Sequence, residues 1–258
     1  AGIVDGVMER LGQALEEYRS DNENLPLYVS LGFATGEKPG EGVAKIFAQA
    51  DADMYKNKFT RRDKVKKNLV AYLRRLVREK DFRNERYEEH QRCLLLLFGQ
   101  VLGLTYQELK DILLLSKVYD IGKAGLDETI LFKKEALDED EWEEIQRHPE
   151  IGRRIASDSP EIAPLADYIW QHHECWNGSG YPRGLKGENI HLYSRILALI
   201  DAYTAMLSPR PYRKPLSHAA AINELKKNRG VQFDPRLVDI FTGLIEQEEF
   251  SQVMGGKI

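Results

Sequence analysis

The spacing of apolar residues over the last two thirds of this chain is the feature that most limits its possible folds. They recur every three or four positions, as on one face of an α-helix, and no segment alternates convincingly as a strand does. Capping signals divide the pattern: Thr105 with Glu108 forms a capping box, and Asp234 precedes Pro235 at a helix start. We therefore predict an all-α body over residues 83–258. The predicted helices are 86–102, 106–118, one running through Trp142 to Ile155, 162–173, 193–207, one from Ser217 to near Gly230, and 235–248.

The first 59 residues have a different pattern. Helical spacing over 3–18 and 43–58 flanks an alternating segment, 27–34, in which the large residues share one face. A single strand cannot satisfy both of its edges, so this helix–strand–helix segment is predicted to be part of something larger. The strings Tyr28-Val29-Ser30-Leu31-Gly32-Phe33-Ala34 and Ala50-Asp51-Ala52-Asp53-Met54-Tyr55-Lys56-Asn57-Lys58 resemble the last part of a GGDEF diguanylate cyclase domain. The resemblance implies a small α/β fragment over 1–59 that lacks the catalytic half; an unrelated α/β fragment is the alternative.

Residues 60–82 are predicted to form a connecting helix. They are rich in charge, and their apolar residues are spaced near three and four, which is typical of an amphipathic helix. Such a stripe would suit a parallel coiled coil, so a homodimer through this helix is possible. A helix that packs on its own domain explains the stripe at least as well.

Composition excludes several classes of protein. The hydrophobic fraction of 42% and charged fraction of 30% are ordinary for a globular protein, and the net charge of −4 argues against non-specific nucleic-acid binding. The only cysteines, Cys93 and Cys175, lie far apart and form no disulfide framework, which favours a reducing compartment. No apolar run approaches the roughly 20 residues of a membrane span. These observations predict a cytoplasmic location.

Histidines and aspartates on the predicted helices indicate a metal site. Two histidines are adjacent, at 172 and 173, and lead into a loop that contains two glycines and a proline. Two aspartates follow apolar helical runs, where a carboxylate is costly to bury unless it is paired or bound to metal. Imidazole and carboxylate suit divalent iron, manganese or zinc, and a shared carboxylate can bridge two ions that activate water for attack on a phosphoryl centre. The candidate ligands are His90, Asp120, His148, His172, His173 and Asp201.

The motifs that contain these residues resemble the HD-GYP family of the HD phosphohydrolase superfamily, over roughly residues 89–245. They are Tyr119-Asp120-Ile121-Gly122-Lys123, Arg147-His148-Pro149, the string from His172 to Pro182, Gly184-Leu185-Lys186-Gly187-Glu188, Arg195-Ile196-Leu197-Ala198 and Arg210-Pro211-Tyr212-Arg213.

The resemblance implies a helical fold with two or three metal ions, often iron, that hydrolyses cyclic di-GMP to pGpG or GMP. Carried over by position, the six candidate ligands would bind metal, with Asp120 bridging, and Lys123 would neutralise the scissile phosphate. The loop Gly180-Tyr181-Pro182, with Arg210 and Arg213, would hold guanine or phosphate, for which the arginine fork is suited. The implied cofactor is divalent iron or manganese, one or two ions per chain. GGDEF-domain proteins are possible partners.

Four positions depart from the family pattern. Tyr119 replaces the histidine of the His-Asp pair, and a phenol with an unperturbed pKa near 10 is a poor ligand. Arg86 stands where three-ion members have a glutamate, and its charge would repel a third cation. Thr204 and Asn177 replace aspartates. One ion pocket, with Asp120, His148, His172 and His173, is complete, whereas the second keeps His90, Asp120 and Asp201 but lacks an imidazole.

Three hypotheses follow from this pattern. The first is a cyclic di-GMP phosphodiesterase with a partly degenerate metal site. The second is an inactive HD-GYP module that binds cyclic di-GMP or partner proteins as a sensor or scaffold. The third is a hydrolase of the same type that acts on another nucleotide. Metal content, product formation and a nucleotide panel separate them.

Overall fold

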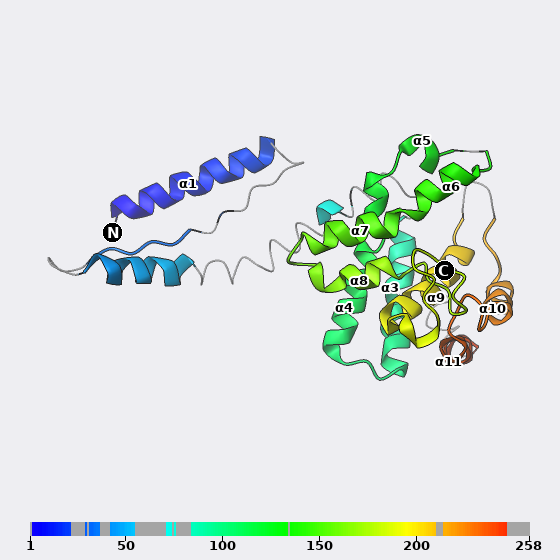
Figure 1. The fold of residues 1–258 in the computed structure, drawn as a ribbon. Helices are drawn as coiled ribbons and strands as arrows, with labels where there is room; N and C mark the ends of the chain where they lie inside the picture. The colour runs from blue at the N-terminus through cyan, green and yellow to red at the C-terminus, as the bar shows by residue number, and fades with distance from the viewer. Residues whose placement is uncertain are drawn as a thin grey trace. The chain divides into compact units, whose positions relative to one another are not determined.

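The fold was analysed in a computed structural model, which describes residues 2–21, 29, 31–36, 42–54, 71–73, 75, 84–133, 135–209 and 214–246. The chain divides into two compact units, residues 1–69 and 70–258 (Figure 1). Each unit is described by itself below.

The N-terminal unit contains helix α1, Gly2–Asp21, and a second helix over 43–54. The predicted strand over 27–34 is wrong for the residues described there, 29 and 31–34, which have no strand assignment. The physical reason is that a lone strand has no neighbour with which to form a ladder of hydrogen bonds. The extended segment instead packs against the second helix. A Cβ on Gly32 would lie 2.2 Å from the backbone of Ala50 and Met54, and Phe33 N–H donates to Asp53 Oδ2 at 3.3 Å.

The predicted connecting helix over 60–82 falls largely outside the described residues. Within it, residues 71–73 and 75 are helical, and Leu73 is buried. The prediction of a homodimer through this helix stays a prediction.

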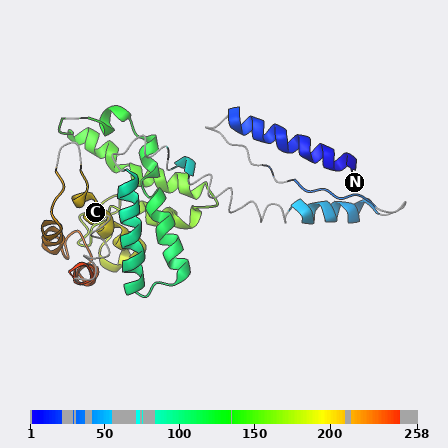
Figure 2. The ribbon, with the colours of Figure 1, turned by 180° about the vertical axis from the view of Figure 1, so that it is seen from behind.

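The C-terminal unit is all-α over its described residues, as predicted, and its only β feature there is an isolated bridge between Arg229 and Phe233. Helices α3 and α4 lie side by side in both views of the ribbon (Figures 1 and 2). The elements are α3 Glu85–Val101, α4 Tyr106–Val118, η1 Ile121–Gly125, α5 Glu128–Leu131, α6 Glu139–Gln146, α7 His148–Ser157, η2 Ala163–Leu165, α8 Ala166–Trp170, η3 Gly187–Asn189, α9 Leu192–Leu207, α10 His218–Lys227 and α11 Pro235–Ile245.

Side-chain caps fix most helix starts where the sequence predicts them. Thr105 and Glu108 form the capping box of α4, Ser217 caps α10, and Asp234 caps α11 by accepting hydrogen bonds from two backbone N–H groups. The continuous helix predicted through Trp142 to Ile155 is wrong: α6 ends at Gln146 and α7 begins at His148. Proline at position 149 has no N–H to donate backward, so the helix restarts there. The predicted helix 162–173 is also shorter, because α8 ends at Trp170.

Helix α9 lies at the centre of the core. It packs against α3, α4, α8, α10 and α11, and most of its residues are buried. Aromatic edge contacts tie these helices together, with ring centroids 5.1 Å apart for Phe98 and Phe241 and 5.2 Å for Tyr203 and Phe241. Fully burying one such large apolar side chain stabilises the fold by about 1.5–3 kcal/mol. Helix α9 also carries Asp201, one of the predicted ligands.

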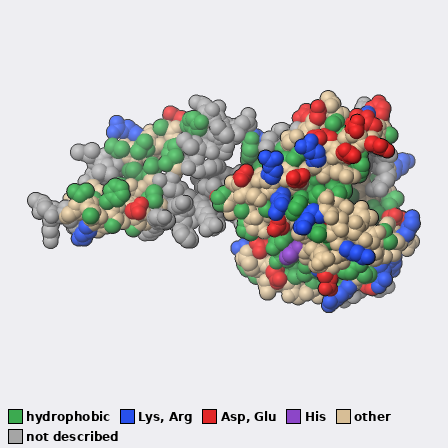
Figure 3. Space-filling model, in the orientation of Figure 1, with side chains coloured by type: hydrophobic (Ala, Val, Ile, Leu, Met, Phe, Trp, Pro, Cys, Tyr) green, Lys and Arg blue, Asp and Glu red, His purple; other side chains and the backbone are tan. Residues whose placement is uncertain are grey.

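The surface and the cysteines bear on the composition-based predictions. Acidic side chains gather over α6 in the view of Figure 3, and Lys and Arg side chains lie elsewhere on the same face. Cys93 and Cys175 are free thiols. None of the helices that the structure describes is long and apolar enough to span a membrane. The cytoplasmic location stays a prediction.

Candidate metal centre

A close helix–helix approach creates the site. Asp120 follows α4 and precedes η1, and η1 packs against the start of α7. Gly122 permits this contact, because a Cβ there would lie 1.8 Å from the carbonyl oxygen of His148 and 2.6 Å from the amide nitrogen of Gly152. The glycine therefore lets the first residue of α7, His148, come to the carboxylate of Asp120.

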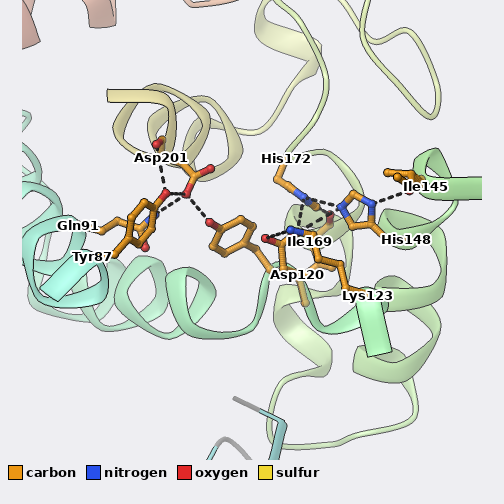
Figure 4. Close-up of polar contacts among 10 residues, drawn as sticks. Tyr87, Gln91, Asp120, Lys123, Ile145, His148, Ile169, His172 and Asp201 are labelled. Atoms are coloured by element: carbon orange, nitrogen blue, oxygen red, sulfur yellow. Dashed lines mark hydrogen bonds and ion pairs between the residues drawn. The ribbon is translucent and has the colours of Figure 1, made fainter. Parts of the chain in front are cut away.

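Two histidines are oriented by backbone carbonyl groups. His148 Nδ1 lies 2.7 Å from the carbonyl oxygen of Ile145, and His172 Nδ1 lies 2.5 Å from that of Ile169 (Figure 4). A carbonyl oxygen can only accept a hydrogen bond, so we assign the hydrogen of each ring to Nδ1 and a lone pair to Nε2. A second hydrogen bond of this kind is how proteins fix the ligating nitrogen of a metal-binding histidine.

The lone pairs of these two rings converge on one carboxylate oxygen. The two Nε2 atoms lie 3.2 Å apart, and Asp120 Oδ1 lies 3.3 Å from that of His148 and 3.6 Å from that of His172. Asp120, His148 and His172 are all buried. Three electron-rich atoms in a buried space repel one another unless a cation lies among them, and this arrangement fits a divalent ion.

Burial favours the neutral, metal-binding state of the His148 and His173 imidazoles. It lowers the pKa of His148 against the opposing effect of Asp120, and it lowers the pKa of His173 well below the ordinary value, with His172 and His148 adding to the shift. One donor atom from each of Asp120, His148, His172 and His173 lies within 4.8 Å of the others. Neutral imidazole with carboxylate is a donor set for iron, manganese or zinc, so these four residues fit a metal ion.

Lys123 brings positive charge to the edge of this cluster. It projects from η1, and its Nζ lies 3.1 Å from Asp120 Oδ2. The side chain is 21% exposed, so part of it is accessible to solvent. The structure thus places Lys123 beside the predicted bridging carboxylate.

The loop with Gly180, Tyr181 and Pro182 lies over His173. The Tyr181 ring stacks on the His173 ring with centroids 4.8 Å apart, and the Tyr181 N–H donates to the His173 carbonyl oxygen at 3.2 Å. Gly180 is required there, since a Cβ would lie 2.2 Å from the amide nitrogen of Cys175. The peptide bond between Tyr181 and Pro182 is cis.

Two residues around this loop were not singled out from the sequence. Buried Glu174 accepts hydrogen bonds from the N–H groups of Arg183 and Leu185, both at 2.8 Å, and so holds the loop from beneath. Trp142 on α6 is 47% exposed and directs an edge contact to Tyr181, with centroids 6.4 Å apart. Glu174 adjoins the histidine pair in sequence, which was an available signal. Nothing in the sequence linked Trp142 to the loop.

Asp201, a predicted ligand on α9, has a different set of neighbours. Its Oδ1 accepts hydrogen bonds from Tyr87 Oη at 2.6 Å, from Gln91 Nε2 at 2.7 Å and from Tyr119 Oη. It does not belong to the four-residue cluster found among the described residues. Figure 4 shows Asp201 with Tyr87 and Gln91 on one side, and Asp120 with His148 and His172 on the other.

His90, the remaining predicted ligand, also lies outside the four-residue cluster. Its Nε2 is buried and has no hydrogen-bond partner within the part of the chain that the structure describes. Burial, with the positive charges of His218 and Arg86, lowers the pKa of His90 to about 4. The ring is therefore neutral at pH 7.

The altered positions have local structural roles. Asn177 Oδ1 accepts hydrogen bonds from the N–H and hydroxyl of Ser179, at 2.9 and 2.7 Å, which closes a turn. Thr204 is buried and donates to the carbonyl oxygen of Ile200 at 2.8 Å. Arg86 is exposed on α3. Arg210 and Arg213, predicted to bind phosphate, lie outside the described residues.

A pocket of about 210 Å³ is lined both by residues of the histidine–aspartate cluster and by Asp201 with its hydrogen-bond donor Tyr119. It lies within the C-terminal unit, and its lining includes the histidine pair on one side and Asp201 on the other. The lining residues that bear polar groups are Tyr119, His172, His173, Glu174, Cys175, Asp201 and Gln232. The pocket therefore gives access to two of the four cluster residues, His172 and His173.

The helical body and its buried cluster define a class of protein, the helical domains whose histidine and aspartate side chains are grouped so that they could hold a metal ion. The family model described as an HD domain matches residues 71–237, and the chain belongs to this family. The matched range contains Asp120, His148, His172 and His173.

Curated relatives agree with this assignment. The chain is 36% identical over 175 residues to the cyclic di-GMP phosphodiesterase response regulator RpfG of Xanthomonas campestris pv. campestris, covering 67% of this chain and 46% of that protein. It is 33% identical over 178 residues to a cyclic di-GMP phosphodiesterase of Thermotoga maritima, covering 68% and 48%. The chain thus spans about half the length of these curated relatives.

Two solved structures share the fold. One is described as a cyclic GMP-AMP specific phosphodiesterase of V. cholerae, with a TM-score of 0.52 and 23% identity over 67% of this chain and 46% of that chain. The other is an HDG"Y"P protein from Bdellovibrio bacteriovorus, with a TM-score of 0.53 and 14% identity over 82% and 75%. At these identities the likeness concerns the fold alone. The GGDEF origin of residues 1–59 stays a prediction.

Proposed function

We propose that this chain is a metal-dependent phosphodiesterase of the HD-GYP type that hydrolyses cyclic di-GMP to pGpG or GMP. The observation that carries the proposal is the convergence of the Nε2 atoms of His148 and His172 on Asp120 Oδ1, with His173 beside them. The names of the curated relatives support the same reaction and substrate.

In this proposal Asp120, His148, His172 and His173 hold a divalent iron or manganese ion. When bound, such an ion lowers the pKa of a coordinated water and polarises a phosphoryl oxygen. The two backbone carbonyls that accept from Nδ1 keep His148 and His172 aligned. Lys123, accessible beside Asp120, neutralises charge on the scissile phosphate.

The loop over His173 supplies the nucleotide contacts. Tyr181 presents a ring that already stacks on His173, and Trp142 adds an exposed aromatic surface next to it. Base–aromatic stacking contributes about 1–3 kcal/mol per base. Gly180 and Pro182 shape the loop, and Arg210 and Arg213 remain proposed phosphate contacts on the sequence pattern alone.

The identity of the two bases of the cyclic dinucleotide substrate is the part of the proposal that the next experiment tests. One solved structure of this fold is described as a cyclic GMP-AMP specific phosphodiesterase. A panel of cyclic di-GMP, 3'3'-cGAMP and cyclic di-AMP decides among substrates of the same chemistry. We expect cyclic di-GMP to be cleaved fastest.

A second function is favoured by one observation. Asp201 accepts hydrogen bonds from three side chains, one of them Tyr119, which stands where the family has a histidine. This arrangement suits an inactive module that binds cyclic di-GMP or a partner protein as a sensor or scaffold. Such a module would keep the Tyr181 loop and its affinity for the nucleotide while losing turnover.

The discriminating experiment uses the full chain, loaded anaerobically with Fe²⁺ or Mn²⁺ and incubated with cyclic di-GMP. Release of pGpG or GMP that is lost in Asp120→Asn and retained in Asp140→Asn, an exposed aspartate on α6, supports the enzyme. Micromolar binding by calorimetry without product supports the sensor. If neither product nor binding is found, both functions are rejected.

We also propose that residues 1–59 derive from the C-terminal part of a GGDEF domain, and that GGDEF-domain proteins and a second copy of this chain are partners. The residue pattern supports the first point, and the packing of the segment around Gly32 against the helix over 43–54 is compatible with it. Light scattering of the full chain at several concentrations tests the dimer. A strictly monomeric mass would contradict it.

A further inference from the structure

We propose that this chain holds one metal ion and not two, because Tyr87, Gln91 and Tyr119 engage the carboxylate that a second ion would need. The inference rests on the metal-binding part of the proposed function and not on its substrate. It concerns Asp201, which the sequence predicts as a ligand and the structure places in a hydrogen-bond network.

The network is built from three helical segments. Tyr87 and Gln91 are four residues apart on α3, so their side chains share one helix face. Tyr119 is the C-cap residue of α4, and Asp201 lies on α9. The three donors are at most 4% exposed: Tyr87 4%, Gln91 3% and Tyr119 3%. Their packing holds the donors in place against the acceptor.

The donors converge on one oxygen atom. Asp201 Oδ1 accepts from Tyr87 at 2.6 Å, from Gln91 at 2.7 Å and from Tyr119. A carboxylate oxygen has about two lone-pair sites, so three donors saturate it. Tyr87 Oη also lies 3.2 Å from the backbone carbonyl oxygen of Asp201, which ties the phenol to α9 through a second acceptor. An ion that bound this oxygen would have to displace buried donors.

The same three groups are unsuitable as ligands in their present state. Amide nitrogen and neutral phenol present hydrogens toward Asp201, not lone pairs. The hydrogens of these donors, which carry partial positive charge, therefore occupy the position beside Asp201 that a second cation would take. The protein meets the need of a buried carboxylate with hydrogen bonds, as buried acidic groups require.

Asp120 and Asp201 have different surroundings, and this difference is the reason for counting one ion. Around Asp120, the nearest imidazole nitrogens carry lone pairs, because their Nδ1 atoms donate to backbone carbonyls. Asp201 Oδ1 instead accepts from Tyr87, Gln91 and Tyr119, side chains that present hydrogens to it. A cation at the Asp120 end meets lone pairs, whereas a cation at Asp201 Oδ1 must displace these donors.

The proposal predicts that restoring the family imidazole alone is not enough. In Tyr119→His, Tyr87 and Gln91 still donate to Asp201, so a second ion binds weakly. In the triple variant Tyr87→Phe, Gln91→Leu, Tyr119→His the carboxylate is released, and we expect the second ion to bind at least about tenfold more tightly than in the single variant, the range seen when groups around a metal site are altered. Tyr119→Phe is the control that removes a donor without adding a ligand.

The first measurement is metal content by elemental analysis of the full chain, after anaerobic incubation with excess Mn²⁺ and desalting. We expect one ion per chain for the natural sequence and for Tyr119→Phe, and two for the triple variant. Two ions in the natural sequence would overturn the proposal. A triple variant that keeps its helical circular dichroism but still binds one ion would overturn it as well.

A second measurement needs no variant, which matters because Tyr87 and Gln91 are buried. Electron paramagnetic resonance of the Mn²⁺-loaded natural chain should show the signal of isolated ions, whereas an exchange-coupled pair would contradict the proposal. The outcome is separable from the proposed function. A one-ion chain that neither binds nor cleaves cyclic di-GMP rejects the function and keeps this inference, and a two-ion chain that cleaves it does the reverse.

Discussion

Substituting Gly122 by alanine should dismantle the metal centre without touching any ligand. A Cβ at this position would lie 1.8 Å from the carbonyl oxygen of His148, and real Cβ contacts essentially never fall below 3.0 Å. The gap must therefore open from 1.8 to at least 3.0 Å, a shift of at least 1.2 Å between η1 and the start of α7. The obstructing atoms belong to backbone, so no side-chain rotation relieves the clash.

This shift moves His148 relative to Asp120. Metal–ligand distances tolerate about 0.2 Å, so a displacement of this size removes a ligand from the first shell of the ion. We expect metal affinity to fall by at least the roughly 10–100-fold that follows from disturbing groups behind the ligands. Overpacking should also lower the free energy of unfolding by about 1–3 kcal/mol. For a domain of this size that is a loss of about 2–12 °C in Tm.

The matched control is Gly125→Ala, in the same short helix. There the nearest atom to an added Cβ is Cγ2 of the Ile151 side chain at 3.0 Å, which can adjust. Metal content by elemental analysis and Tm by circular dichroism should be near those of the natural chain for Gly125→Ala, and both should fall for Gly122→Ala. A folded Gly122→Ala variant that binds metal with unchanged affinity would refute the reasoning.

Three further predictions concern the loop and the buried histidine. Glu174→Gln leaves one acceptor where Arg183 and Leu185 N–H groups now find two, so KM for the nucleotide should rise several-fold in turnover assays with little change in metal content; an unchanged KM would contradict the positioning role. Trp142→Ala should weaken nucleotide binding by about 1–3 kcal/mol in calorimetry if the ring stacks on a base, whereas Tyr106→Ala, an exposed aromatic on α4, should have no effect. The pKa of His90 is lowered to about 4 from 6.5, so the unfolded chain binds more protons between these values and the free energy of unfolding should fall as the pH drops from 6.5 to 4. Urea unfolding of the chelator-treated chain, measured across this pH range, should show a smaller fall in the free energy of unfolding for His90→Gln. An equal fall in both proteins would reject this prediction.

The sequence predicted the helical body because its signals are local. Thr105, Ser217 and Asp234 begin helices where the sequence predicts them, since a cap depends on hydrogen bonds within one turn. The break between α6 and α7 is also local, and the proline at 149 was a signal that the helical spacing on both sides obscured. The strand over 27–34 failed because a strand depends on a partner that periodicity cannot supply.

The candidate site was predictable where motifs place several donors in one string, as with the histidine pair. The different surroundings of Asp120 and Asp201 were not predictable in this way. Asp120 and Asp201 follow similar apolar runs, yet Asp120 Oδ1 faces imidazole lone pairs and Asp201 Oδ1 faces hydrogen-bond donors. That difference arises from Tyr87 and Gln91, neutral side chains with no metal-binding signature, which come near Asp201 only when α3 packs against α9.

The most direct test of the account is anomalous diffraction from a crystal of the natural chain soaked with Mn²⁺. The account predicts an anomalous peak within bonding distance of Asp120 and of the Nε2 atoms of His148 and His172, with His173 beside it. A soaked crystal with no peak at these residues, or with its ion bound elsewhere while the two Nε2 atoms stay in contact, would contradict the central claim that this cluster is a metal centre.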